Sequence, residues 1–165
     1  EWRQKALAIR EENIGKDHPH TANTYHNIAV DYQNQGRYDL ALEWHQKALA
    51  IFERILGKDH PETAVVYHSI ASVYGKQGKY DLALEWYQKA LAIREKALGN
   101  DHPDTATSYY NIALVYRDQA EYNLALEWLN KALVIFETRL GSDHPYTSNA
   151  KKSIARVESK LKSSN

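Results

Sequence analysis

The tripeptide Asp-His-Pro occurs four times in the chain, and the interval between successive copies is always 42 residues. The tryptophans follow the same period, each inside a variant of Leu-Glu-Trp-x-x-Lys-Ala-Leu, at Trp2, Trp44, Trp86 and Trp128. A fixed internal period of this length is typical of architectures in which one structural unit stacks on its neighbours. We therefore expect a repeated motif and not a single irregular core.

The first part of each period predicts a helix with one buried face. Its apolar residues recur at the spacing i, i+3, i+4 and i+7, which in the first full period gives Tyr25, Ile28, Ala29 and Tyr32. The helix should begin near Pro19, because proline suits the first helical turn, and end near Gly36, because glycine tolerates the left-handed conformation that follows a helix.

The second part predicts a helix from about Asp39 to Leu56, ended by Gly57 and its counterparts one and two periods later. A helix wedged between successive hairpins must bury more than one face, and the apolar residues here are spread widely enough to do so. Trp44 precedes Ala48 and Ile51 by four and seven residues, so the tryptophans are expected in the core and not in an exposed stripe for self-association.

The period divides the chain into five segments: a half repeat holding only a second helix, 1–16; three complete hairpins, 17–58, 59–100 and 101–142; and a terminal first helix, 143–165. The chain starts inside an amphipathic pattern with no capping residue before it, so we expect a fragment of a longer protein. In the terminal helix Ile154 and Ala155 keep the apolar register among several lysines, and this polar character suits a cap on the stack.

Composition excludes several classes of function. Lysine plus arginine and aspartate plus glutamate are equal at 21 each, so no net charge attracts nucleic acid. The chain has no cysteine, which rules out disulfides, thiolate metal sites and cysteine nucleophiles. No apolar run approaches the about 18 residues that span a membrane, and a cytoplasmic location is a default, not a deduction.

Neither catalysis nor metal binding is predicted. The sequence holds no glycine-rich phosphate loop, no His-Glu-x-x-His and no serine in a nucleophile elbow, so we expect no enzyme activity and no cofactor. Histidine and aspartate are common metal ligands, but each linker supplies one of each and the linkers of stacked repeats are a helix pair apart. Capping of the helix that starts at the proline explains the tripeptide better.

The motif Tyr25-x-x-Ile28-Ala29-x-x-Tyr32, followed by Ala41-x-x-x-His45, resembles the tetratricopeptide pattern, although His45 and Leu129 replace its second aromatic residue. The longer period, with Ala-Leu-x-Ile, Leu-Gly-x-Asp-His-Pro and Asn-Ile-Ala, resembles the repeats of kinesin light chains. The resemblance implies an all-α, right-handed superhelical solenoid of antiparallel helix hairpins. It also implies a scaffold whose first helices line a concave groove for a peptide or partner protein.

The side of each first helix opposite its buried stripe is expected to line that groove. Asparagine amides there can pair with both N–H and C=O groups of an extended peptide, and Val30 and Leu114 offer shallow apolar contacts. An ordinary solvated face is the alternative. The candidate residues are Asn23, His26, Asn27, Val30, Asn34, His68, Ser69, Ser72, Lys76, Tyr110, Asn111, Leu114, Arg117, Lys152 and Arg156.

Three further hypotheses concern this face and the ends of the array. Another branch of the family clamps a terminal carboxylate with lysine and asparagine, and here Lys152, helped by Arg156 and Arg117, offers comparable charge. His26 and His68 on neighbouring first helices would make binding sensitive to pH near 6.5. The chain could instead be a structural spacer that self-associates weakly through exposed repeat ends.

Overall fold

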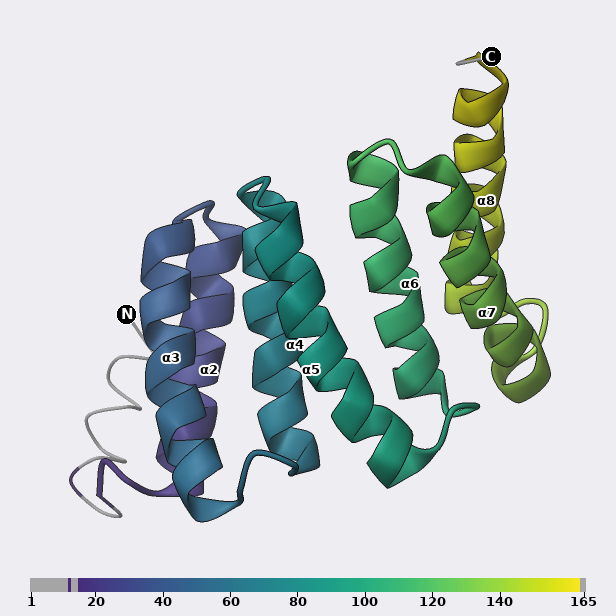
Figure 1. Ribbon diagram of the computed structural model, residues 1–165. Coiled ribbons are helices and arrows are strands. Elements are labelled where there is room, and N and C mark those ends of the chain that lie inside the picture. The colour runs from purple at the N-terminus through teal and green to yellow at the C-terminus, as the bar shows by residue number, and fades with distance from the viewer. Residues whose placement is uncertain (1–11, 13–14, 164–165) are drawn as a thin grey trace. The chain divides into compact units, whose positions relative to one another are not determined.

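The computed structural model describes residue 12 and residues 15–163, and the regular secondary structure of this part is all α-helix, joined by short turns (Figure 1). The predicted half repeat, 1–16, and Trp2 lie almost entirely outside the described residues. The chain divides into two compact units, one up to Trp86 and one from Tyr87. The helices are α2 Pro19–Asn34, α3 Tyr38–Ile55, α4 Pro61–Lys76, α5 Tyr80–Leu98, α6 Pro103–Asp118, α7 Tyr122–Leu140 and α8 Pro145–Ser163.

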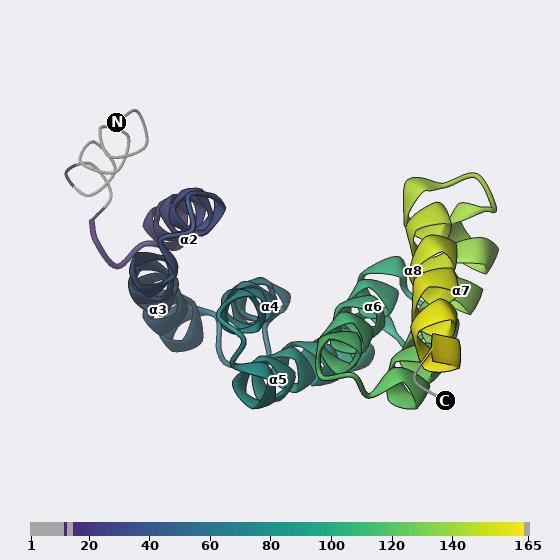
Figure 2. The same cartoon turned by 90° about the horizontal axis from the view of Figure 1, so that it is seen from above.

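In the first unit α2 and α3 form an antiparallel hairpin, and α4 packs against α3 (Figures 1 and 2). Ala29 and Ala41 are both fully buried, so these two small side chains let the helices approach closely. Phe52, nearer the other end of α3, also belongs to the core and is 1% exposed. The predicted all-α class and the buried stripe of the first helix are therefore confirmed, and α3 begins and ends one residue earlier than expected.

The second unit repeats this packing in α6, α7 and α8. Ala113, Ala125, Leu129 and Val157 form a core cluster with no exposed surface, and Trp128 packs against it.

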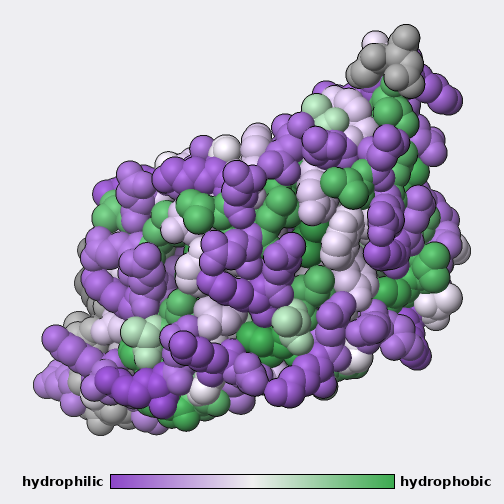
Figure 3. All heavy atoms as spheres, in the orientation of Figure 1, coloured by the Kyte–Doolittle hydropathy of each residue, from purple (hydrophilic) through white to green (hydrophobic). Residues whose placement is uncertain are grey.

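Hydrophilic side chains predominate on the face shown in Figure 3, with hydrophobic residues scattered among them. No helix among the described residues is long and apolar enough to cross a membrane.

Each turn inside a hairpin places the second residue past the first helix in the left-handed region. Gly36 and Gly78 have φ of 73°, and Ala120 takes the same place with φ of 64°. The backbone bonds match: the N–H of Arg37 donates to Tyr32 O at 2.9 Å, as do the equivalent groups of the other turns. Ala120 therefore adopts a conformation that costs an alanine more than a glycine.

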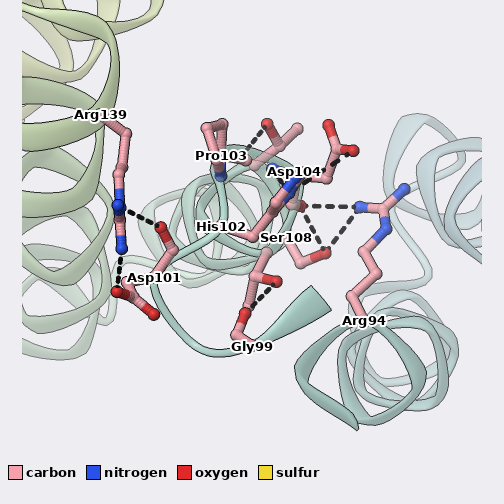
Figure 4. A network of polar contacts seen from close by, with 10 residues as sticks. Arg94, Gly99, Asp101, His102, Pro103, Asp104, Ser108 and Arg139 are labelled. Carbon is pink, nitrogen blue, oxygen red and sulfur yellow. Dashed lines mark hydrogen bonds and ion pairs between the residues drawn. The ribbon is translucent and has the colours of Figure 1, made fainter. Parts of the chain in front are cut away.

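The linker between hairpins is built in the same way in all four copies. The histidine of Asp-His-Pro is the N-cap, and its Nδ1 accepts the backbone N–H two residues on, at 3.1 Å for His102 and Asp104. The threonine that follows donates its hydroxyl to the carbonyl of the preceding glycine at 2.8 Å, as Thr105 does to Gly99. Figure 4 shows this second-unit linker with two arginines beside it.

One of these arginines comes from α5, which precedes the linker, and the other from α7. Arg94 of α5 donates to Ser108 Oγ at 2.7 Å and to the carbonyl of Asp104 at 3.2 Å (Figure 4). Arg139 of α7 pairs with the Asp101 carboxylate and lowers the pKa of this fully exposed group. The linker is thus held both by its own cap and by neighbouring cations.

The terminal helix corrects one expectation. Ile154 is half-buried and Ala155 is exposed, whereas the equivalent Ala29 and Ala113 are fully buried. Instead α8 buries the side that meets the preceding hairpin, at Thr147, Ala150, Ser153 and Val157. The physical reason is that no helix follows α8 within the described residues, so the face of α8 that would meet such a helix stays uncovered.

Candidate functional site

The predicted groove residues of the first unit form an accessible polar surface on α2 and α4. Asn27, Asn34 and Lys76 are exposed, and none of the others in this unit is buried: Asn23, His26, Val30, His68, Ser69 and Ser72 are half-buried. Gln33 of α2 donates to Ser72 Oγ of α4 at 3.0 Å, so the two helices present these residues side by side.

Two of the predicted residues of the second unit line a cavity of about 190 Å³. Tyr110 and Asn111 of α6 line it together with Thr107. Phe136 of α7 and Tyr146 and Asn149 of α8 complete the wall, and sequence reasoning missed all three. Leu114 is half-buried on the same helix as Tyr110.

The repeat pattern does contain a signal for one of these three residues, Tyr146. Tyr146 occupies the position that Asp104, Glu62 and His20 hold in the other copies, so an aromatic ring replaces a polar side chain only there. The ring is 50% exposed and its centroid lies 5.5 Å from that of Phe136. Phe136 itself is buried and its period position gives no hint that it borders a cavity.

A second, more open hollow of about 650 Å³ in this unit carries net positive charge. Arg117 and Asp118 of α6 line it with Arg156, Ser159 and Lys160 of α8. Arg117 Nε donates to Asp118 Oδ1 at 2.8 Å, which neutralises part of that charge. The structure thus brings together Arg117 and Arg156 of the suggested carboxylate clamp, while the exposed Lys152 does not line the hollow.

Two histidines face each other inside the α2–α3 hairpin. The ring centroids of His26 and His45 are 5.0 Å apart, and His45 is fully buried. Burial lowers the pKa of His26, and burial together with the neighbouring His26 lowers the pKa of His45 to about 3. The sequence hypothesis named His26 and His68 on neighbouring first helices, and it did not foresee that the ring of His45 on the following helix lies beside His26.

Candidate metal ligands are dispersed. Among the described residues, no three histidine, aspartate or glutamate side chains lie close enough together to hold a metal ion. The linker histidines use Nδ1 to cap their helices, for example His60, which accepts from the N–H of Glu62 at 3.2 Å.

Two tyrosines on the buried stripe bond to carboxylates of the preceding helix. Tyr67 Oη donates to Glu53 and Tyr109 Oη donates to Glu95, the latter at 2.7 Å. Burial and the adjacent carboxylate raise the pKa of both hydroxyls well above the ordinary value for tyrosine. These groups stay protonated at neutral pH and tie successive hairpins together.

Solved structures share this architecture. A kinesin light chain of Podosopora anserina with nearly identical tetratricopeptide-like repeats is 26% identical, with a TM-score of 0.75 over 94% of this chain and 74% of that one. BtubC from P. vanneervenii is 23% identical, with a TM-score of 0.82 over 94% of this chain and 62% of that one. The apo form of RapI is 24% identical, with a TM-score of 0.77 over 97% of this chain and 54% of its own.

No curated protein matches the sequence. The family model described as tetratricopeptide repeat matches four overlapping segments, 1–44, 21–96, 66–138 and 110–164. These segments together take in nearly the whole chain, in agreement with the helix hairpins and the 42-residue period described above. The chain belongs to the tetratricopeptide repeat family.

Proposed function

We propose that this chain is a protein-interaction scaffold that binds a peptide or partner protein on the first helices of its repeats, α2, α4, α6 and α8. Tetratricopeptide repeats bind protein or peptide partners, which supports the general role. The observation that carries the specific proposal is the cavity of about 190 Å³ beside α6, because two of the candidate binding residues, Tyr110 and Asn111, line it together with Thr107.

The lining of this cavity suits a peptide. The amides of Asn111 and Asn149 can each donate to a carbonyl and accept from an N–H, as an extended backbone requires. Phe136 and Tyr146 supply aromatic walls for one side chain of the ligand. Binding, and not catalysis, is what these groups can do, since none of them is paired as a nucleophile and base.

A displayed library of random peptides, selected on the full chain, tests the proposal. Peptides recovered on the wild type should bind Asn111→Ala at least about tenfold more weakly, since a lost hydrogen bond in a partly desolvated site costs about 1.5 kcal/mol. Asn130→Ala is the matched control, because Asn130 is exposed on the second helix α7. Equal affinity of the selected peptides for both variants and the wild type would refute binding at this face.

The alternative role as a self-associating spacer has one observation in its favour, the exposed stripe of α8 at Ala155 and the half-buried Ile154. Stacking of a second copy on this stripe would bury it. Light scattering at high protein concentration separates the two roles. A mass that grows with concentration and returns to that of the monomer in Ala155→Glu would support the spacer, whereas a constant monomer mass would rule it out.

A further inference from the structure

His45 lies at the centre of the α2–α3 hairpin with no hydrogen-bond partner. It has no exposed surface, and neither Nδ1 nor Nε2 meets a donor or acceptor among the described residues. Nδ1 of His26 is also without a partner there. A neutral imidazole carries one donor and one acceptor, so a buried ring with neither satisfied is costly and unusual.

The other hairpins place different side chains at this point. One period later the second helix has Tyr87, and two periods later it has Leu129. The partner position on the first helix holds His26, then His68, then Tyr110. A pair of histidines is therefore particular to the hairpin α2–α3 among the complete repeats, and the fold does not require it.

Few charged groups are placed to compensate a proton on this pair. From α2, His26 faces His45, and its own positive charge would repel that of His45. The neighbouring Tyr25 of α2 packs on Trp44, with ring centroids 5.5 Å apart. From α4, Tyr67 donates to Glu53, which lies eight residues after His45 on α3, and His68 is a further base that brings no negative charge. The charged group that shifts the pKa of His45 is His26, and it lowers that pKa.

We propose that the His26–His45 pair makes the α2–α3 hairpin an acid-sensitive element, which loosens when the surroundings become mildly acidic. A proton on His45 would place an unpaired charge among apolar side chains, next to a second base. Opening the hairpin lets water solvate that charge. The equivalent hairpin α6–α7, with Tyr110 and Leu129 in these places, has no such response.

The direction of the effect follows from linkage between protonation and folding. In the folded hairpin the pKa of His45 is about 3, whereas in an unfolded chain it returns to the ordinary 6.5. The open form therefore binds the proton more readily, and the stability of the hairpin is fully present above about pH 6.5 and decreases as the pH falls toward 3. One pH unit below the ordinary value shifts the opening equilibrium about tenfold.

This inference extends the proposed function, because His26 lies on the face expected to bind a ligand, but its test needs no ligand. The measurement is amide hydrogen exchange of the full chain at about pH 7.5 and about pH 5.5, corrected for the intrinsic rate. Protection of α2 and α3 should fall about tenfold more than that of α6 and α7. His45→Leu, which copies the third hairpin, should abolish this difference.

Two further variants keep the result interpretable. His68→Tyr removes a histidine at the same place in the next first helix and should leave the difference intact. If His45→Leu does not fold, His45→Tyr copies the second hairpin and gives the same reading. Equal loss of protection in α2–α3 and α6–α7, or an unchanged difference in the position-45 variants, would overturn the inference even if peptides bind as proposed.

Direct titration of the imidazole gives an independent check. The ring signals of His45 in the nuclear magnetic resonance spectrum should not titrate between about pH 7.5 and about pH 5.5 while the hairpin is closed. A His45 that titrates with an ordinary midpoint while the hairpin stays closed would contradict the inference.

Discussion

Three tryptophans of the described chain, Trp44, Trp86 and Trp128, are half-buried, each with its ring against a tyrosine. Lys47 Nζ lies 4.3 Å from the ring centroid of Trp44, and Lys131 Nζ lies 4.9 Å from that of Trp128. The indole therefore packs on the core with one side while a lysine covers the other. At Trp44 and Trp128 this arrangement combines burial of apolar surface with cation–π attraction to a lysine.

Replacing Trp86 by alanine should lower the free energy of unfolding by about 3 kcal/mol, because the change removes a large ring from its contact with Tyr67. Partial exposure of the indole places the expected loss at the lower end of the range for buried aromatic residues. Urea denaturation followed by circular dichroism measures it. A loss below about 1 kcal/mol would mean that the tryptophan is not part of the core.

His45→Leu should stabilise the chain even at neutral pH. The change removes two buried nitrogens that have no partner among the described residues, and each such atom costs about 1 kcal/mol or more. Leucine already fills this position in the third hairpin, where Leu129 is fully buried. The midpoint of urea unfolding at about pH 7.5 should therefore rise, and a lower midpoint would show that His45 makes a contact leucine cannot replace.

The turns inside the hairpins give a prediction about a whole element. Ala120→Gly should stabilise the α6–α7 hairpin by about 1 kcal/mol, because a left-handed backbone costs alanine about that much relative to glycine. Gly78→Ala is the mirror control and should destabilise by a similar amount. A Cβ at Gly78 would meet no atom within 4 Å, so backbone strain alone decides the sign. Thermal unfolding of both variants measures the two effects, and shifts of the same sign would contradict this account.

The helices were predictable because each carries its own signals. Pro19 starts α2, Gly36 follows its end, and the apolar spacing between them identifies the buried face. The exposure of Ala155 on α8 and the His26–His45 contact were not predictable in the same way. Both depend on which side chains a neighbouring helix brings. The place of Ala155 or His45 within the 42-residue period does not reveal whether such a helix packs there. The cavity beside Asn111 has the same origin, since α7 and α8 supply half of its wall.

On the scale of the chain, each helix contacts mainly the helices next to it in the sequence. A destabilising substitution should therefore affect only the helices near it. Trp128→Ala should raise hydrogen exchange in α6, α7 and α8, around the core cluster that Trp128 contacts, well before it affects α2 and α3. Trp44→Ala should show the reverse order. Exchange that rises uniformly in both variants would mean that the two units unfold together.

The linker has a consequence for how such a chain can change its length. Its threonine donates to the carbonyl of its glycine at 2.8 Å in all four copies. Its histidine caps the helix that follows in all four as well. If a stretch of one period is duplicated or deleted, each remaining pair of hairpins is therefore still joined by a complete linker, whichever residue of the period the stretch begins at. Recombination between copies can add or remove a hairpin in one step. The unit that is gained or lost is the 42-residue period.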